Sequence, residues 1–376
     1  MEPLAAKRQP KIRVQMRKNR GTSTRQNDFT RAHHSGDTPE DTHHSERVSH
    51  KGGLTRKRTV VGDQAGGQVV RAVNETTCRP GRVLRAIGAT QCLVQDDATG
   101  TNVSCTVRRL LRTMASDERT AVVAGDRVLY QPLDNQQGVI ERVDARQSVL
   151  TRKHQYREHV LVANVTQVLI VASLGEPPLK PPLIDRFLLS AAKGNVAAAI
   201  CLNKADLVDL IDLQPLIALY SRLGYAVIPT SPLTGVGMER LRQLLRGQQT
   251  VLAGQSGVGK SSLINAIQPS LALRTGAVSD VTQKGRHTTR YAQLLQLDSG
   301  GWVVDTPGIR QLDLWDVNKG EVEGFFNEFR PFVPYCKFPN CLHLDESECA
   351  IRAAVDAGFI SRQRYESYLR MVVDDD

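Results

Sequence analysis

The distribution of hydrophobic and polar positions divides the chain into four regions. Residues 1–75 are polar and show almost no apolar periodicity. Such a segment buries too little apolar surface to offset its loss of chain entropy, so we predict a disordered basic extension. Short apolar runs alternate with turn residues over 76–152, strands alternate with helical patterns over 153–318, and residues 319–376 are mostly helical. We therefore expect three folded domains behind the extension.

Five short strand-like segments fill the first folded region: GRVLRAIG, QCLVQ, VSCTVRRLL, DRVLYQPL and GVIERVDA. Val103, Cys105 and Val107 alternate with polar neighbours, as expected of a half-buried strand. Five such strands predict a small β-barrel, with the OB-fold as leading candidate. OB barrels often bind RNA or single-stranded DNA, and the alternative for each arginine here is simple solvation of the surface. The candidate contacts are Arg82, Arg85, Arg108, Arg109 and Arg112.

The second folded region alternates buried strands with helical patterns. The pattern predicts strands over 168–172, 197–202, 226–229, 251–253, 291–297 and 302–304, and helices over 183–192, 213–223 and 238–245. This alternation is typical of a parallel, doubly wound α/β sheet.

Positive charge is concentrated in the N-terminal extension. The first 58 residues hold 14 Lys and Arg against six Asp and Glu, whereas the whole chain has a net charge of +10. Basic tails bind nucleic acid through phosphate contacts. The extension is therefore an RNA-binding arm, or else a solubilising leader or the result of a misassigned start codon. Its acidic residues argue against an organellar transit peptide.

Apolar runs and cysteine spacing bear on the compartment. The sequence has no run of about 18 apolar residues, as a membrane span needs, and no apolar stretch of the secretory type at its N-terminus. Seven cysteines, three of them clustered near the C-terminus, fit a reducing compartment with one metal site better than a disulfide framework. We expect a cytoplasmic, monomeric protein that does not enter a membrane.

A glycine-rich loop lies between a short apolar strand and a helical pattern. It fits G-x-x-x-x-G-K-S, the phosphate-binding loop, whose backbone N–H groups converge on phosphate oxygens at the positive end of the helix. Lys260 would reach the β- and γ-phosphates, and Ser261 would bind Mg²⁺. The alternative is a simple glycine-rich turn, and the strand and helix patterns on either side of the loop disfavour it. The predicted nucleotide-binding residues are Gly254, Gln255, Ser256, Gly257, Val258, Gly259, Lys260, Ser261 and Ser262.

A second phosphate-sensing motif follows a predicted strand. Asp305-Thr306-Pro307-Gly308 has the D-x-x-G arrangement. Asp305 would hold Mg²⁺ directly or through water, and the Gly308 N–H would contact the γ-phosphate. The tetrapeptide alone is a weak signal, but its place after a strand and downstream of the glycine-rich loop strengthens it.

The sequence N-K-A-D, formed by Asn203, Lys204, Ala205 and Asp206, predicts guanine recognition. The Asp206 carboxylate can accept hydrogen bonds from guanine N1–H and from the exocyclic amine. Adenine lacks both donors and would leave buried acceptors unpaired, at a cost of roughly a few kcal/mol. Thr230-Ser231 ends the next predicted strand, where a backbone N–H would reach guanine O6. A helix start capped by Asp206 is the alternative, and the two phosphate motifs disfavour it.

The order of these motifs is unusual, because most GTPases begin with the phosphate loop and end with the guanine-selecting element. Here N-K-A-D precedes G-K-S, which precedes D-T-P-G. A circular permutation preserves the spatial neighbours of a sheet and changes only where the chain begins and ends. The D-T-P-G loop then leads directly into the C-terminal region.

With these motifs the sequence closely resembles the RsgA (YjeQ) family of circularly permuted GTPases, which assist maturation of the small ribosomal subunit. The similarity covers roughly residues 79–370 and includes V-A-N-V-T-Q at 162–167, I-D-R-F-L at 184–188 and G-R-H-T-T-R at 285–290. The resemblance implies an OB-fold, a circularly permuted α/β P-loop GTPase domain and a small helical zinc-binding domain. It also implies a cytoplasmic protein that binds the small (30S) subunit and its rRNA, and whose GTPase activity that subunit stimulates.

The segment 285–290 lies where the first switch of a GTPase belongs. One of its two threonines should bind Mg²⁺ with GTP; we favour Thr289 and leave Thr288 open. Many GTPases orient the attacking water with a glutamine just after D-x-x-G, but that place is taken by Ile309. His287 is the candidate substitute, and the resemblance supports this catalytic role. A surface histidine in a mobile loop is the alternative.

Four soft metal ligands lie within 14 residues near the C-terminus. They are Cys336, Cys341, His343 and Cys349. Thiolate and imidazole together favour tetrahedral Zn²⁺, and a full Cys₃His set indicates a closed structural site. Three free buried cysteines beside an unrelated histidine would be the alternative.

These expectations describe a GTP-hydrolysing assembly factor that binds GTP with Mg²⁺, one structural Zn²⁺, and the small ribosomal subunit with its rRNA. The alternative class is a GTP-regulated RNA-binding protein in which hydrolysis is incidental. A small-molecule kinase with the same phosphate loop is disfavoured, because N-K-A-D would then have no purpose.

Overall fold

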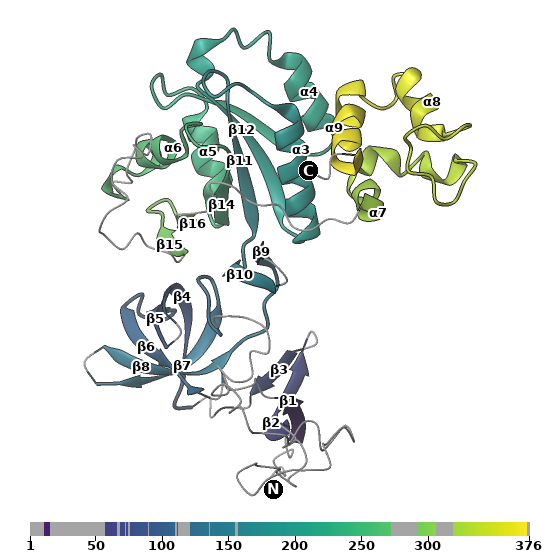
Figure 1. The fold of residues 1–376 in the computed structure, drawn as a ribbon. Helices are drawn as coiled ribbons and strands as arrows, with labels where there is room; N and C mark the ends of the chain where they lie inside the picture. Colours follow the sequence, from purple (N-terminus) through teal and green to yellow (C-terminus); the bar gives the residue numbers. More distant parts are fainter. Residues whose placement is uncertain are drawn as a thin grey trace, which may run out of the picture.

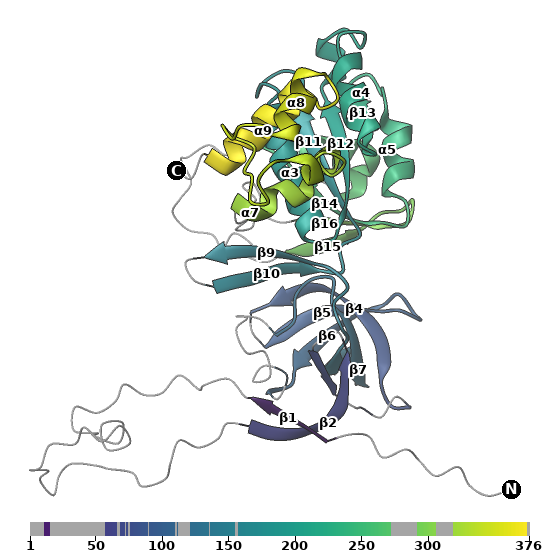
Figure 2. The same cartoon turned by 90° about the vertical axis from the view of Figure 1, so that its right-hand side faces the viewer.

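The structure, a computed structural model, describes residues 11–15, 57–65, 68–71, 73, 76–88, 90–109, 111, 121–134, 136–154, 157–271, 292–305 and 319–373. A small barrel lies below a layered α/β domain, and a helical C-terminal domain lies beside the latter (Figures 1 and 2). Within the described ranges, no helix is both long enough and apolar enough to cross a membrane.

The barrel consists of strands that pair in a closed ring. They are β4 (Arg79–Ile87), β5 (Gln91–Asp96), β6 (Asn102–Val107), β7 (Arg127–Leu133) and β8 (Gln137–Val143). The order β4-β5-β6-β8-β7 returns to β4, and β6 runs parallel to β8 while the other neighbours are antiparallel. Val103, Cys105 and Val107 point into the core, and the residues between them are exposed. The predicted OB-type barrel is confirmed.

Three strands lie where the sequence predicted no regular structure. They are β1 (Lys11–Gln15), β2 (Lys57–Ala65) and β3 (Gln68–Arg71), joined as antiparallel neighbours. Strands β2 and β3 contain β-branched runs, and a Gly-Gly pair separates them in the sequence. These are ordinary strand and turn signals, which the low apolar content of the region as a whole had obscured.

A buried polar joint connects the barrel to the α/β domain. The sequence had not predicted the hairpin of β9 (Val149–His154) and β10 (Arg157–Ala163) that lies there. Asn164 Nδ2 donates to Gly125 O at 3.0 Å, and Gln249 Nε2 donates to Ala163 O at 3.0 Å. A Cβ on Gly125, whose φ is +89°, would lie 2.0 Å from Ala163 O, so the joint requires glycine. Because Gln249 opens the strand before the glycine-rich loop, this strand also anchors the barrel.

The α/β domain is built on a sheet of order β13-β12-β11-β14-β16-β15. Its strands are β11 (Gln167–Ser173), β12 (Ala197–Asn203), β13 (Ala226–Thr230), β14 (Gln249–Ala253), β15 (Gln293–Gln296) and β16 (Trp302–Asp305). Neighbours from β13 to β16 are parallel, and β15 is antiparallel to β16. Gln293 of β15 also pairs with Arg85 of β4, which joins the sheet to the barrel.

Helices cover both faces of the sheet. They are α3 (Pro181–Lys193) and α4 (Gln214–Arg222) on one face and α5 (Met238–Leu245) and α6 (Lys260–Ile267) on the other, with short 3-10 helices η1 (Ala205–Leu207) and η2 (Pro269–Leu271). Ile170 packs in the core that contains Phe187, whereas its neighbour Leu169 packs with Leu241 on the opposite face. The predicted doubly wound arrangement is confirmed.

The C-terminal domain is assembled from short helices around an aromatic core. They are α7 (Lys319–Val322), η3 (Glu323–Phe325), η4 (Asn327–Phe329), η5 (Val333–Tyr335), α8 (Ala350–Asp356) and α9 (Arg362–Val373). The ring of Tyr368 lies 5.4 Å from that of Phe326 and 5.0 Å from that of Phe329, measured between centroids. Leu189 of α3 packs into the same core, so this domain is docked on the α/β domain.

Candidate nucleotide site and metal centre

The predicted nucleotide motifs follow strands that end at one edge of the sheet. Ser173, at the end of β11, is in register with Asn203, and Asn203 is in register with Thr230. Strand β14 ends at Ala253, just before the glycine-rich loop, and its parallel neighbour β16 ends at Asp305. Ligands of open α/β sheets bind at this carboxyl edge. The permuted chain order therefore brings N-K-A-D, the glycine-rich loop and the start of D-T-P-G to one place.

The glycine-rich loop has the backbone that a phosphate-binding loop requires. Gly254, Gly257 and Gly259 have φ values of +142°, +82° and +97°. A Cβ on Gly254 would lie 2.2 Å from Val171 O, so a side chain does not fit there. Lys260 opens α6, and its Nζ lies 2.7 Å from Gly254 O and 2.6 Å from Gln255 O. The ammonium group is thus held over the loop, where phosphate oxygens would enter.

Asn203 connects the guanine-selecting segment to the glycine-rich loop. Its side chain is buried, and its Nδ2 donates to Val258 O at 2.8 Å. Thr230 Oγ1 donates to Asn203 Oδ1 at 3.2 Å, which fixes the amide orientation. A Cβ on Gly259 would lie 2.3 Å from Asn203 Nδ2, so the close approach of the two loops depends on glycine. These contacts hold the N-K-A-D segment against the glycine-rich loop.

The rest of N-K-A-D crosses toward the loop after β11. Lys204 has a left-handed backbone, with φ of +64°, and its Nζ donates to Glu176 O. Ala205 is buried at the start of η1, whereas Asp206 is exposed. Leu207 lies 2.5 Å from the position of a Cβ on Gly175, so these two loops are also in close contact. Asp206 is thus accessible to solvent between neighbours that contact the adjacent loop.

The loop after β13 differs from the expectation in one detail. Ser231 is fully buried, and its N–H donates to Val236 O at 2.9 Å. Its Oγ accepts from Thr234 N at 3.2 Å. The Ser231 N–H is therefore paired within the loop in this structure. The assignment of a backbone N–H of this turn to guanine O6 stays a prediction from the sequence.

Several predicted residues lie outside the described part of the chain. They are His287, Thr288, Thr289 and Gly308, together with the side chain of Asp305. The assignments to catalysis, to Mg²⁺ and to the γ-phosphate therefore stay predictions from the sequence.

The four predicted metal ligands converge in the C-terminal domain. The ligand atoms of Cys336, Cys341, His343 and Cys349 all lie within 4.8 Å of one another. His343 Nδ1 is 3.3 Å from Cys349 Sγ and 3.6 Å from Cys336 Sγ. His343, Cys341 and Cys349 are buried, and burial raises the pKa of the Cys341 thiol to about 12. A bound cation would offset this cost and favour the thiolate.

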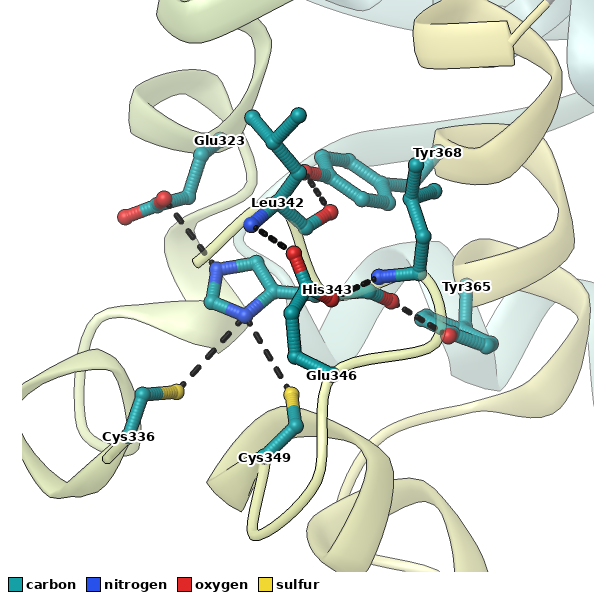
Figure 3. Close-up of polar contacts among 9 residues, drawn as sticks. Glu323, Cys336, Leu342, His343, Glu346, Cys349, Tyr365 and Tyr368 are labelled. Atoms are coloured by element: carbon teal, nitrogen blue, oxygen red, sulfur yellow. Dashed lines mark hydrogen bonds and ion pairs between the residues drawn. The ribbon is translucent and has the colours of Figure 1, made fainter. Parts of the chain in front are cut away.

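Hydrogen bonds hold the backbone around His343 in an uncommon conformation (Figure 3). His343 has φ of +59°, in the left-handed region. The Glu346 carboxylate accepts from Leu342 N and Leu344 N, both at 2.7 Å. Tyr365 and Tyr368 of α9 donate their hydroxyl protons to His343 O and Leu342 O, at 2.6 and 2.8 Å. Glu346 and the two tyrosines of α9 therefore fix the backbone that carries the histidine.

Comparison with known proteins identifies the family of this chain. The family model described as RsgA GTPase matches residues 143–315. A Thermotoga maritima protein named small ribosomal subunit biogenesis GTPase RsgA is 42% identical over 281 residues, which cover 74% of this chain and 90% of that protein. The chain belongs to the RsgA GTPase family. A Chlorobaculum parvum protein of the same name is 38% identical over 312 residues, covering 80% of this chain and 98% of its own.

Two solved structures share the fold. The crystal structure of YjeQ from Thermotoga maritima matches with a TM-score of 0.65 and 38% identity, covering 78% of this chain and 97% of that one. The structure of YloQ, described as a circularly permuted GTPase, matches with a TM-score of 0.62 and 28% identity, covering 80% and 96%. The permutation inferred from motif order thus has a counterpart in a solved structure.

Some contacts that shape the two sites have no signature in the sequence. The backbone carbonyl of Glu176 accepts a hydrogen bond from Lys204, and that of Val258 accepts one from Asn203. The Glu323 carboxylate contacts the His343 ring. A backbone carbonyl has no signature in the amino-acid sequence. Glu323 precedes the metal ligands by 13 or more positions, in a separate element, and no spacing rule connects them.

Proposed function

We propose that this protein hydrolyses GTP to GDP and phosphate and acts in maturation of the small ribosomal subunit. The observation that carries the nucleotide choice is the hydrogen bond of 2.8 Å from Asn203 Nδ2 to Val258 O. It ties a guanine-selecting motif to a phosphate-binding loop, which a kinase with the same loop would not need. The names of the RsgA relatives support the ribosomal role.

Each motif has a distinct task in this proposal. Asp206 accepts hydrogen bonds from the N1–H and the amine of guanine. Asn203 holds the glycine-rich loop, and Lys204 holds the loop after β11. The backbone from Gly254 to Gly259 and the Lys260 ammonium bind the phosphates. Ser261, Thr289 and Asp305 would hold Mg²⁺, which supplies charge neutralisation between the β- and γ-phosphates when bound. Gly308 contacts the γ-phosphate.

His287 is the proposed group that orients the attacking water. Phosphoryl transfer depends mainly on positioning and on charge stabilisation. A neutral imidazole nitrogen can accept a hydrogen bond from the water. This contact would direct a lone pair of the water oxygen at the γ-phosphorus. Ile309, in the place of the usual glutamine, has no polar atom for this task.

We propose that the Cys₃His cluster binds one structural Zn²⁺. With Zn–N of about 2.0–2.1 Å and Zn–S of about 2.3 Å, a tetrahedral ion requires an N···S separation of about 3.5 Å. The measured separations from His343 Nδ1 to Cys349 Sγ and Cys336 Sγ, 3.3 and 3.6 Å, fall on either side of that value. Four protein ligands leave no open position, so the ion would be structural. We further propose that the protein is a cytoplasmic monomer and that its barrel binds rRNA.

Turnover measurements with purified small subunits test the function. We expect slow GTP hydrolysis by the protein alone and clear stimulation by small subunits, with no stimulation by large subunits. Co-sedimentation should detect tighter subunit binding with a non-hydrolysable GTP analogue than with GDP. A rate that small subunits leave unchanged, with equal binding in both nucleotide states, would favour an RNA-binding protein whose hydrolysis is incidental.

A further inference from the structure

The imidazole of His343 lies between two chemically different neighbours (Figure 3). Its Nδ1 faces the thiols of Cys349 and Cys336, at 3.3 and 3.6 Å. Its Nε2 lies 3.1 Å from Glu323 Oε2, and the His343 side chain is only 1% exposed. Water therefore has little access to the ring, and each nitrogen has a defined partner.

The Glu323 carboxylate decides which nitrogen of His343 carries the proton. A neutral imidazole has one N–H and one free lone pair, and the partner of one nitrogen sets the state of the other. A carboxylate accepts but does not donate, so the proton belongs on Nε2 and the lone pair on Nδ1. The lone pair is then directed at the space that the thiols surround.

The nearby carboxylate of Glu346 cannot replace Glu323. Both of its oxygens accept backbone N–H groups, from Leu342 and Leu344. Its role is to shape the turn that contains His343, not to contact the imidazole. Among the described residues, the polar contacts of the ring are the two thiols and Glu323.

We propose that Glu323 is the outer-sphere positioning residue of the metal centre, which fixes His343 as an Nδ1 ligand. Outer-sphere acceptors of this kind orient the ligating histidine and strengthen its lone pair. The inference rests on the proposed metal site but adds a residue to it.

The position of Glu323 gives this assignment a structural consequence. Glu323 opens η3 directly after α7, the first described element downstream of Asp305. Glu321 of α7 in turn pairs with Lys193 of α3 at 3.0 Å. The segment formed by α7 and η3, which follows the D-T-P-G motif in the chain, is therefore part of the metal centre. Metal binding and the placement of this segment should depend on each other.

Metal affinity of three variants tests the proposal. Glu323→Leu keeps the side-chain volume and removes the acceptor, while Glu323→Gln keeps a weaker, uncharged acceptor oxygen. Glu321→Gln is the matched control, a neighbouring carboxylate that contacts Lys193 instead of the histidine. In competition with a chromogenic zinc chelator, we expect Glu323→Leu to bind Zn²⁺ about 10–100-fold more weakly. Glu323→Gln should lie between it and the parent, and Glu321→Gln should stay within about twofold of the parent.

A spectroscopic readout separates positioning from a general loss of structure. With ¹⁵N-labelled histidine, long-range ¹H–¹⁵N spectra of the zinc-loaded full-length parent should show metal at Nδ1 and a slowly exchanging proton on Nε2 of the His343 ring. In Glu323→Leu that proton should exchange faster, while guanine nucleotide affinity stays at the parent value. If Glu323→Leu does not fold, the parent spectrum and Glu323→Gln still decide.

The outcomes distinguish this proposal from the one on which it rests. A parent that binds no zinc would remove the metal site itself. A zinc-loaded parent coordinated through Nε2, or Glu323→Leu with parental zinc affinity, would overturn only the role of Glu323.

Discussion

Arg364 Nη1 donates to Asp185 Oδ1 at 2.6 Å, and this pair joins α9 of the C-terminal domain to α3 of the α/β domain. Both side chains are buried, with exposures of 3% and 0%. Because α3 lies on one face of the sheet of the α/β domain, the pair connects the C-terminal domain to the body of the GTPase domain.

Further contacts compensate the cost of burying these charges. Tyr220 OH donates to Asp185 Oδ1 at 2.8 Å, and Arg364 Nε donates to Glu328 Oε1 at 2.6 Å. The guanidinium also lies 4.4 Å from the centre of the Phe326 ring. Burial alone would lower the pKa of Arg364, but Asp185 and Glu328 raise it above its ordinary value. The arginine therefore stays charged, and loss of either carboxylate would leave buried charge uncompensated.

Arg364→Met should weaken the docking of the C-terminal domain strongly. Removing one partner of a buried ion pair costs about 3–5 kcal/mol. Hydrogen exchange of the α9 amides under native conditions measures this local stability. Arg362→Met is the control, because Arg362 and its partner Asp356 are 73% and 76% exposed, and it should change stability by less than about 0.5 kcal/mol. Equal protection of α9 in the two variants would contradict the prediction.

Asp206→Asn should change the choice of base. The amide loses the charged acceptor for guanine N1–H and the exocyclic amine, which should weaken GTP binding about 10–100-fold. Xanthine has a carbonyl where guanine has its amine, so the amide donor of the variant should improve binding of xanthosine triphosphate. Fluorescence titration with both nucleotides measures the switch.

Asp209→Asn is the matched control for base choice. Asp209 lies in the same loop, and its Oδ1 accepts from Ile211 N at 2.9 Å. It should keep the parental preference for GTP. Parental GTP affinity in Asp206→Asn would remove N-K-A-D from the nucleotide site.

Lys260→Ala and His287→Ala should separate binding from chemistry. Lys260 contacts phosphates in the bound state, so its loss should lower GTP affinity at least about tenfold. His287 acts on the attacking water, so its loss should leave affinity intact and slow single-turnover hydrolysis by about 10²–10⁴-fold. Quenched single-turnover assays with small subunits present measure the second effect. An unchanged rate in His287→Ala would exclude the water-orienting role.

Local motifs made much of the nucleotide site and of the metal cluster predictable. The glycines at 254, 257 and 259 adopt positive φ because the loop must curl, and this requirement is visible in the sequence as residue type and spacing. Cys336, Cys341, His343 and Cys349 lie close in the sequence, so their convergence followed from spacing alone. The catalytic assignment to His287 and the Mg²⁺ assignments to Thr289 and to the Asp305 side chain, in contrast, lie outside the described part of the chain.

Contacts between distant segments could not be predicted in the same way. Arg364 and Asp185 are separated by 179 positions, and Glu323 and His343 by 20. No periodicity or motif connects such pairs, because tertiary packing alone brings them together. The β9–β10 hairpin was missed for a local reason: only residues 164–166 separate β10 from β11, and the turn is made at Asn164, with φ of +55°. Asparagine tolerates this conformation, so the break has no glycine or proline to mark it.

Nucleotide state and small-subunit binding should be coupled through the C-terminal domain. Only residues 306–318 separate Asp305 from α7, which Glu321 ties to Lys193 and whose successor η3 contacts the metal cluster. A loop held by the γ-phosphate has two arrangements, and its release should therefore move or loosen this domain. We expect the GTP-bound form to bind subunits more tightly than the GDP form.

Reciprocity then requires subunits to raise the ratio of GTP-analogue to GDP affinity by the same factor. Nucleotide titrations with and without subunits measure this ratio, and zinc-free protein should show a smaller change because its C-terminal domain is loosened. If subunits leave the ratio unchanged in the zinc-loaded protein, the C-terminal domain is a scaffold and carries no coupling.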